Sequence, residues 1–165
     1  MYAPGDVRVE DRDKPVIEEP TDAIIRVVAA CVCGSDLWPY RGANAVDAPM
    51  HMGHEYCGTV VEVGSAVKSV KPGQFVVGSF CLSDNTCPHC AFGFQSSCMQ
   101  REFMTGAQSQ FARVPLADGT LAVTLDNGPA DKACTADMVP RVSLVGGPEG
   151  VDPTKDLDIV VTMAQ

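Results

Sequence analysis

The alternation of hydrophobic and polar positions predicts short β-strands separated by turns. A largely apolar, β-branched run over residues 23–32 predicts a buried strand. The same reasoning predicts further strands at residues 7–9, 59–63, 75–80, 111–114, 121–124, 142–145 and 156–162. A single short helix is expected over residues 129–139. The pattern therefore predicts a mainly-β domain, a barrel or a sandwich, with little helix.

Clusters of Pro, Gly, Asn and Asp predict the connections between these strands. Residues 38–49 are expected to form a loop, and turns are expected at Lys71-Pro72-Gly73 and Asp118-Gly119. Residues 83–98 form a lobe that is too rich in polar and small residues for a packed element. This lobe also holds Cys87, Cys90 and Cys98, residues of the kind that bind zinc.

Composition narrows the function classes. The chain has 165 residues, enough for one domain with a real core, and its net charge is -9. An acidic balance argues against a nucleic-acid partner, because phosphate binding needs clustered Lys and Arg. No apolar run is long enough to cross a membrane, and the start has no signal-peptide pattern. Eight cysteines in such a chain favour metal binding or reduced thiols, and a cytoplasmic location is expected.

The first candidate site combines Cys33 and His54, which stand at the ends of separate predicted strands. A thiolate and an imidazole suit zinc, and Glu55 could be a further or alternating ligand. Asp36 is placed to orient the histidine ring as an outer hydrogen-bond acceptor, and the Ser35 hydroxyl could take a proton from a zinc-bound alcohol. Taken singly, a cysteine beside a strand is more often a small core residue, and a His-Glu pair is more often surface. The combination favours a metal site, whereas Cys31 and Cys57 are expected to be buried thiols.

The second candidate site is Asp84-x2-Cys87-x2-Cys90-x7-Cys98 within the lobe. Three thiolates and one carboxylate can form a closed tetrahedral zinc site, harder and weaker than an all-thiolate site. Cys81 does not fit the spacing, and His89 is a rival donor that is expected to face solvent. A disulfide alternative needs an oxidising compartment, for which nothing in the sequence argues.

Several fixed spacings together resemble one family. The segments Cys33-Gly34-Ser35-Asp36 and Gly53-His54-Glu55-x2-Gly58-x5-Gly64-x2-Val67 are similar to signatures of the zinc-dependent alcohol dehydrogenases, which belong to the medium-chain dehydrogenase/reductase superfamily. The resemblance implies a GroES-like β-barrel catalytic domain over residues 1–140, a structural zinc lobe at 83–98, and a strand-rich tail at 141–165 that completes or caps the barrel. It also implies that Cys33 and His54 hold the catalytic zinc, that Glu55 lies beside it, and that Ser35 relays the proton.

The family uses NAD(P) on a small alcohol or carbonyl substrate, and the nucleotide needs a Gly-x-Gly-x-x-Gly strand-turn-helix. The nearest match, residues 146–150, has the wrong spacing and carries Pro148 where a helix should begin. No Rossmann domain is therefore expected in these residues, and Gln74 stands where the family usually has Asp. The leading hypothesis is a catalytic-domain fragment or deletion form that binds zinc but is inactive alone, since hydride transfer needs the cofactor.

Two other classes of function stay open. The first is a non-catalytic zinc module that binds a partner chain, and the second is zinc-assisted hydrolysis of a substrate by an activated water. Hydrolysis is disfavoured, because the sequence offers no convincing general base beyond Glu55. A homo-oligomer is plausible from the family resemblance alone.

Overall fold

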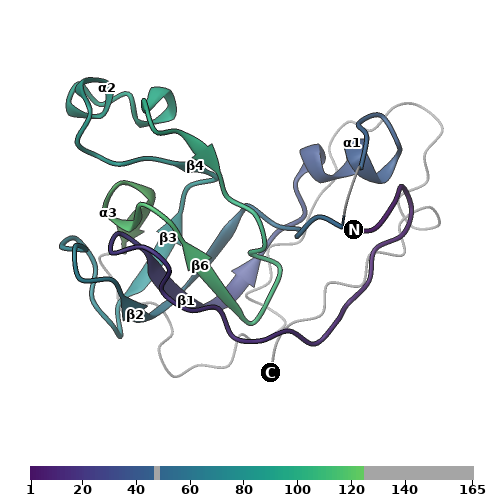
Figure 1. The fold of residues 1–165 in the computed structure, drawn as a ribbon, viewed down its shortest axis with the longest axis horizontal. Coiled ribbons are helices and arrows are strands. Elements are labelled where there is room, and N and C mark those ends of the chain that lie inside the picture. Colours follow the sequence, from purple (N-terminus) through teal and green to yellow (C-terminus); the bar gives the residue numbers. More distant parts are fainter. Residues whose placement is uncertain (47–48, 125–165) are drawn as a thin grey trace.

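The computed structural model describes residues 1–46 and 49–124, and in this part of the chain strands dominate (Figure 1). The strands are β1 (Ala23–Ala30), β2 (Tyr56–Val63), β3 (Phe75–Gly78), β4 (Cys81–Leu82), β5 (Glu102–Phe103), β6 (Phe111–Val114) and β7 (Leu121–Val123). The helices are single turns: α1 (Leu37–Tyr40), α2 (Pro88–Ala91), α3 (Ala117–Thr120) and the 3-10 turns η1 (Gly34–Asp36) and η2 (Gln95–Ser97).

Five of the strands form one antiparallel sheet in the order β6-β1-β2-β3-β7. Strands β1 and β2 are its centre, and their register runs from Ala23 opposite Val63 to Ala30 opposite Tyr56. Because the pair is antiparallel, the residues that follow β1 lie beside those that precede β2. The register shifts twice within this pair, between Ile24 and Ile25 and again after Val27, as expected for a strongly bent sheet.

The hydrophobic core lies against this sheet, and its members come from β1, β2, β3, β6 and the segments beside them. Ile24, Ile25 and Val76 are fully buried. A close backbone approach explains why Gly58 stands in β2: an added Cβ would collide with the Arg26 carbonyl oxygen of β1. Only a glycine lets these two central strands reach their observed separation.

The lobe projects from the sheet on the short ribbon formed by β4 and β5 (Figure 1). Backbone and side-chain hydrogen bonds fix the base of this ribbon to the body of the domain. Ser79 N–H donates to the Thr120 carbonyl at 3.0 Å, and the buried Ser83 hydroxyl donates to the Gly119 carbonyl at 2.7 Å. The lobe therefore has a defined position relative to the sheet although few of its residues pack in the core.

The structure confirms a mainly-β fold with little helix, and it corrects several local expectations. Residues 7–9 do not form a strand, and Val9 is 91% exposed, because no neighbouring strand pairs with them. The predicted strand at 75–80 ends at Gly78 as β3, and residues 79 and 80 connect it to β4, which belongs to a different sheet. The predicted loop at 38–49 begins inside α1.

Two further expectations concern single turns of helix. The Asp118-Gly119 turn is part of α3, and the lobe contains α2 and η2, which the polar composition hid. Short helical turns carry too few periodic positions to show in a sequence pattern. The predicted helix at 129–139 and strands at 142–145 and 156–162 lie outside the described residues.

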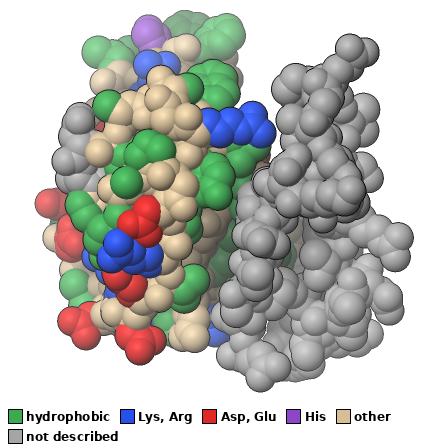
Figure 2. All heavy atoms as spheres, turned by 90° about the vertical axis from the view of Figure 1, so that its right-hand side faces the viewer, with side chains coloured by type: hydrophobic (Ala, Val, Ile, Leu, Met, Phe, Trp, Pro, Cys, Tyr) green, Lys and Arg blue, Asp and Glu red, His purple; other side chains and the backbone are tan. Residues whose placement is uncertain are grey.

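The described surface has no single-sign charged face in the view of Figure 2, where acidic and basic side chains lie next to one another. Arg8 and Asp6 form an ion pair of this kind at 2.7 Å. Such mixing gives no basic stripe for a phosphate backbone on this face. Within the described residues, no helix is long and apolar enough to cross a membrane.

Candidate metal centres

The first cluster forms where β1 ends and β2 begins. Cys33 follows β1 and caps η1, while His54 and Glu55 immediately precede β2. The backbone link between Cys31 N–H and the Glu55 carbonyl, 3.0 Å long, continues the strand pairing to this point. As a result, donor atoms of Cys33, His54 and Glu55 lie within 4.8 Å of one another. The sheet thus brings together residues that are distant in sequence.

Asp36 organises both sides of this cluster. Its Oδ2 accepts a hydrogen bond from the Cys33 backbone N–H at 2.9 Å, which fixes the turn that carries the thiol. Its Oδ1 lies 3.5 Å from His54 Nδ1 and so faces the ring nitrogen that is not directed at Ser35. Asp36 is only 7% exposed, so the two contacts hold the carboxylate within the protein. The sequence predicted the histidine contact, whereas the bond to Cys33 became visible only in the structure.

The Ser35 hydroxyl lies on the opposite side of the histidine ring. Its Oγ is 3.2 Å from His54 Nε2, and Ser35 itself is exposed. A hydroxyl in this place is in contact with both solvent and Nε2 of the histidine ring. It is therefore well placed to exchange protons between the site and water.

The donor set fits zinc. A thiolate, an imidazole and a carboxylate are the ligand types that zinc prefers, and a site with few protein ligands keeps a position open for substrate. Cys33 and His54 are half-buried and Glu55 is exposed, so the cluster is open to solvent on one side. Openness of this kind is typical of catalytic rather than structural zinc.

The sequence analysis did not predict that Phe80 lies beside the first cluster. The Phe80 ring lies edge-on to the His54 ring, with centroids 6.3 Å apart and planes at 69°. Phe80 stands between β3 and β4, and no motif or spacing relates it to His54. Only the route of the chain from the sheet into the lobe places the two rings together.

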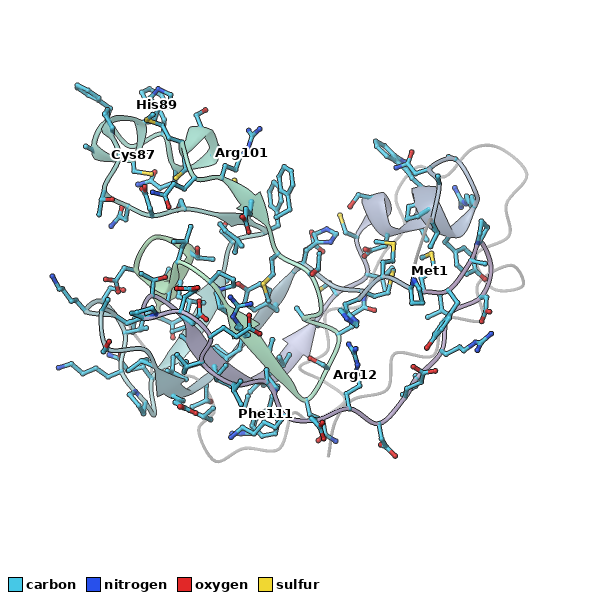
Figure 3. The ribbon with its side chains drawn as sticks, viewed as in Figure 1. Met1, Arg12, Cys87, His89, Arg101 and Phe111 are labelled. Atoms are coloured by element: carbon cyan, nitrogen blue, oxygen red, sulfur yellow. The ribbon has the colours of Figure 1, made fainter. Side chains whose placement is uncertain are left out.

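The second cluster lies in the lobe, where Figure 3 labels Cys87 and His89. Donor atoms of its predicted members lie within 4.8 Å of one another: Asp84, Cys87, Cys90 and Cys98. Cys90 and Cys98 are buried, at 4% and 6% exposure. The donor atoms therefore converge on one point inside a small, mostly closed lobe, as a structural zinc site requires.

Backbone hydrogen bonds prepare these side chains for a cation. Asp84 Oδ1 accepts from the backbone N–H groups of Thr86 at 2.9 Å and Cys87 at 3.0 Å. Cys98 Sγ accepts from the N–H groups of Asp84 at 3.4 Å and Gln100 at 3.3 Å. Donors aimed at sulfur and carboxylate oxygen favour their negatively charged forms.

The same contacts shift the pKa values of the group. Backbone hydrogen bonds from Thr86 and Cys87 hold the pKa of Asp84 well below its usual range, and backbone hydrogen bonds lower the pKa of Cys87. Burial, with the neighbouring thiols, raises the pKa of Cys90 to about 12. Without a cation Cys90 therefore keeps its proton at neutral pH, so metal binding in the lobe has to release a proton.

The other cysteine and histidine residues considered in the sequence analysis lie outside the two clusters. Cys81 is buried outside the lobe cluster, and His89 is exposed with its Nδ1 2.6 Å from the Ser97 carbonyl. The prediction of buried thiols was wrong for Cys31, which is exposed, and Cys57 is half-buried. Cys31 directly follows β1, and Cys57 is the second residue of β2, so both lie near the first cluster. In the lobe, the Cys87 and Cys98 sulfur atoms are 4.0 Å apart and do not form a disulfide.

Comparison with known protein families identifies the family to which this chain belongs. The alcohol dehydrogenase GroES-like domain matches residues 19–124, so the chain belongs to that family. Its mainly-β architecture is accordingly the GroES-like fold of the zinc-type, medium-chain alcohol dehydrogenases, as the sequence resemblance implied.

Individual relatives agree with this assignment. Zinc-type alcohol dehydrogenase B of Aspergillus flavus is 40% identical over 126 residues, covering 73% of this chain and 29% of the relative. Medium chain reductase/dehydrogenase ucsI of an Acremonium species is 36% identical over 174 residues, covering 98% of this chain and 59% of the relative. Among solved structures, alcohol dehydrogenase TADH from Thermus sp. ATN1 superposes with a TM-score of 0.69 at 32% identity, covering 74% of this chain and 38% of that one. The chain thus spans less than two thirds of the length of each.

Proposed function

We propose that these residues form the zinc-binding catalytic domain of an alcohol dehydrogenase-like oxidoreductase. The observation that carries the proposal is the first cluster: Cys33, His54 and Glu55 converge to within 4.8 Å at the open end of β1 and β2. Asp36 lies beneath them and contacts both the histidine ring and the cysteine backbone. This arrangement of soft, nitrogen and oxygen donors with an orienting carboxylate is the chemistry a catalytic zinc needs.

When bound, zinc would supply Lewis-acid polarisation of an alcohol or carbonyl oxygen. Cys33 as a thiolate and His54 as a neutral imidazole would hold it, with Glu55 as a further or exchanging ligand. Asp36 Oδ1, 3.5 Å from His54 Nδ1, would favour the tautomer with its proton on Nδ1, in which Nε2 carries the lone pair for a cation. Ser35, exposed and 3.2 Å from Nε2, accepts a proton from the substrate hydroxyl and passes it to water.

In the lobe, we propose a structural zinc held by Asp84, Cys87, Cys90 and Cys98. The support is the convergence of four donors in a segment with little hydrophobic core of its own. A bound cation would replace the missing packing energy. One Asp84 oxygen is engaged by two backbone N–H groups, so its other oxygen is the one available to a cation.

Substrate, cofactor, location and assembly follow from the same proposal. We propose a small alcohol or its carbonyl counterpart as substrate, and NAD(P) as the hydride carrier of the complete reaction. These 165 residues hold no Gly-x-Gly-x-x-Gly turn, so we expect no NADH formation by them alone. An exposed thiol such as Cys31, which forms no disulfide, persists best in a reducing compartment, and we propose a cytoplasmic location on that ground. A homo-oligomer or a partner chain is compatible with this proposal.

The decisive experiment is metal analysis combined with cobalt substitution, because cobalt reports thiolate coordination by its absorption. We expect about two ions per chain in the unmodified protein and about one in Cys33→Ser. Cys31→Ser is the matched control, since Cys31 is exposed, lies two residues away and is outside the cluster. Equal metal content in Cys33→Ser and the unmodified chain, with an unchanged spectrum, would contradict the proposal.

A further inference from the structure

A cavity of about 280 Å³ lies where the lobe meets the body of the domain. Asp84 and Thr86 line its lobe side, while Ala66, Lys68 and Asp118 line the side formed by the segment after β2 and by α3. Thr86, Ala66 and Lys68 are exposed, so the cavity is open to solvent. Because a water molecule in the liquid takes up about 30 Å³, the cavity has room for a small organic molecule.

Hydrogen bonds between and within the two sides hold the cavity in shape. The backbone N–H groups of Lys68 and Ser69 donate to the Asp118 carboxylate at 2.8–3.1 Å. At the base of the lobe, the Ser83 hydroxyl donates to the Gly119 carbonyl at 2.7 Å. A small molecule that enters the cavity therefore does not have to order its walls.

Asp84 is the member of the lobe cluster that lines this cavity. Cys87, Cys90 and Cys98 are not part of the lining, and Cys90 and Cys98 are buried, whereas Asp84 is half-buried. A donor that arrives through the cavity thus meets the carboxylate of the cluster before it meets a cysteine sulfur.

The local backbone stabilises Asp84 when it is not bound to a cation. Its Oδ1 accepts hydrogen bonds from the N–H groups of Thr86 at 2.9 Å and Cys87 at 3.0 Å, which compensate the negative charge of the carboxylate. Zinc is a borderline-soft ion, and thiolate sulfur suits it better than carboxylate oxygen does. Among the four donors of the lobe cluster, Asp84 is therefore the one that an incoming sulfur donor displaces at the lowest cost.

We propose that this cavity binds small thiols, and that a bound thiol takes the place of Asp84 in the lobe cluster, which makes the lobe zinc exchangeable. This inference rests on the proposed function, since it takes zinc to be held by the lobe donors. The step is a ligand substitution without electron transfer: the thiol sulfur bonds to the cation, the Asp84 oxygen leaves it, and the thiol proton passes to water. The freed carboxylate keeps its hydrogen bonds to Thr86 and Cys87. Small thiols can thus deliver zinc to the lobe or remove it.

The test measures zinc release from the full 165-residue chain carrying Cys33→Ser, in which zinc is expected in the lobe alone. A zinc-sensitive dye reports the rate while the concentration of 2-mercaptoethanol is raised, and we expect the rate to rise in proportion to the thiol. Ala66→Leu narrows the cavity and should reduce this dependence about fivefold, with the rate in the absence of thiol unchanged. Ser65→Leu is the matched control, because Ser65 is exposed and adjacent but does not line the cavity.

A second variant tests the displaced ligand itself. Asp84→Cys replaces the leaving carboxylate by a thiolate, and we expect it to slow thiol-dependent release about tenfold or more. Ala66 is exposed and Asp84 is half-buried in the lobe, so neither substitution should prevent the sheet from folding. Circular dichroism of each variant would check this.

A release rate that does not depend on the thiol concentration would overturn the inference, and so would equal slowing in Ala66→Leu and Ser65→Leu. Zinc content separates this failure from that of the proposed function. If the Cys33→Ser chain holds about one zinc ion but its release ignores the thiol, the exchange is wrong and the lobe site stands. If that chain holds no zinc, the proposed lobe site fails, and the inference that depends on it fails as well.

Discussion

The two donor clusters are built in opposite ways. The lobe cluster takes all its candidate donors from residues 84–98, and its buried thiols lie in a segment with only α2 and η2 as regular structure. The first cluster takes Cys33 from the end of one strand and His54 from the start of another, and the sheet supplies the geometry. The donors of the lobe cluster are therefore close in sequence, whereas those of the first cluster are brought together by strand pairing.

This difference predicts how the lobe and the sheet each respond to loss of metal. Without a cation, the lobe has donors but little apolar burial, so its order should depend on metal. The central strands bury Ile24, Ile25 and Val76 completely and should stay folded when the first cluster is empty. Metal loss should thus unfold one region and leave the other in place.

Removing a lobe ligand should have the largest effect. In Cys90→Ser we expect loss of about one zinc ion per chain and of several kcal/mol of lobe stability, since structural zinc supplies folding free energy. Zinc analysis and hydrogen exchange of residues 84–98 would measure both effects. Cys81→Ala is the control, because Cys81 is buried beside the lobe but lies outside the cluster. A full zinc content in Cys90→Ser would show that the lobe does not use this thiol.

Disturbing the central strand pair should weaken metal binding at the first cluster and leave the lobe cluster unaffected. Gly58→Ala forces a methyl group against the Arg26 carbonyl, which we expect to destabilise the sheet by about 1–3 kcal/mol. Cobalt binding at Cys33 and His54 should weaken, while lobe zinc stays bound. Gly34→Ala is the control, since that glycine lies next to Cys33 with open space around it. Chemical denaturation and cobalt titration would measure the outcome, and parallel weakening of both sites would refute the independence of the lobe.

A smaller, local effect should follow from Asp36→Asn. The neutral amide would hold the Cys33 turn and the His54 ring less well, so we expect metal affinity at the first cluster to fall about 10- to 100-fold. The lobe site in the same molecule serves as the internal control and should be unchanged. Competitive titration with a coloured chelator would measure the two affinities, and an unaltered first site would rule out the orienting role of Asp36.

The smallest expected effect concerns the hydrogen bonds of Asp118, a residue outside both donor clusters. Asp118 accepts hydrogen bonds from the Lys68 and Ser69 backbone N–H groups at 2.8–3.1 Å and from the Ser69 hydroxyl at 2.7 Å. Burial acts to raise the pKa of Asp118, but the hydrogen bonds from Ser69 and Lys68 outweigh it, so the pKa lies below its ordinary value. Its contribution to stability is therefore present above the ordinary carboxyl pKa and is lost as the pH falls through the lowered value.

In Asp118→Asn we accordingly expect the chain to be about 1 kcal/mol less stable at pH 7 and to lose less stability between pH 5 and pH 3. Thermal melts across this pH range would measure the difference. Asp11→Asn, an exposed substitution, is the control and should melt like the unmodified chain at every pH. An Asp118→Asn profile parallel to that of the unmodified chain would show that this carboxylate does not contribute to acid sensitivity.

Prediction from sequence succeeded where neighbours in the chain are also neighbours in space. The lobe spacing identified all four donors that converge there, and the apolar run at 23–32 identified β1. Prediction from sequence failed where a contact depends on the path of the backbone through the fold. The end of β3 at Gly78, before the chain enters the second sheet, and the contact between Phe80 and His54 have no signature in the local pattern.

The sequence by itself determined the family, the mainly-β fold and the residue types of both donor clusters, because spacing and side-chain chemistry are written along the chain. Only the tertiary structure gave the distances in the first cluster, with donor atoms within 4.8 Å of one another. It alone also revealed the hydrogen bond from the Cys33 backbone to Asp36 and the Phe80 ring beside His54. The physical reason is strand pairing: the register of β1 with β2, and the exit of the chain through β4, set distances that no local preference encodes.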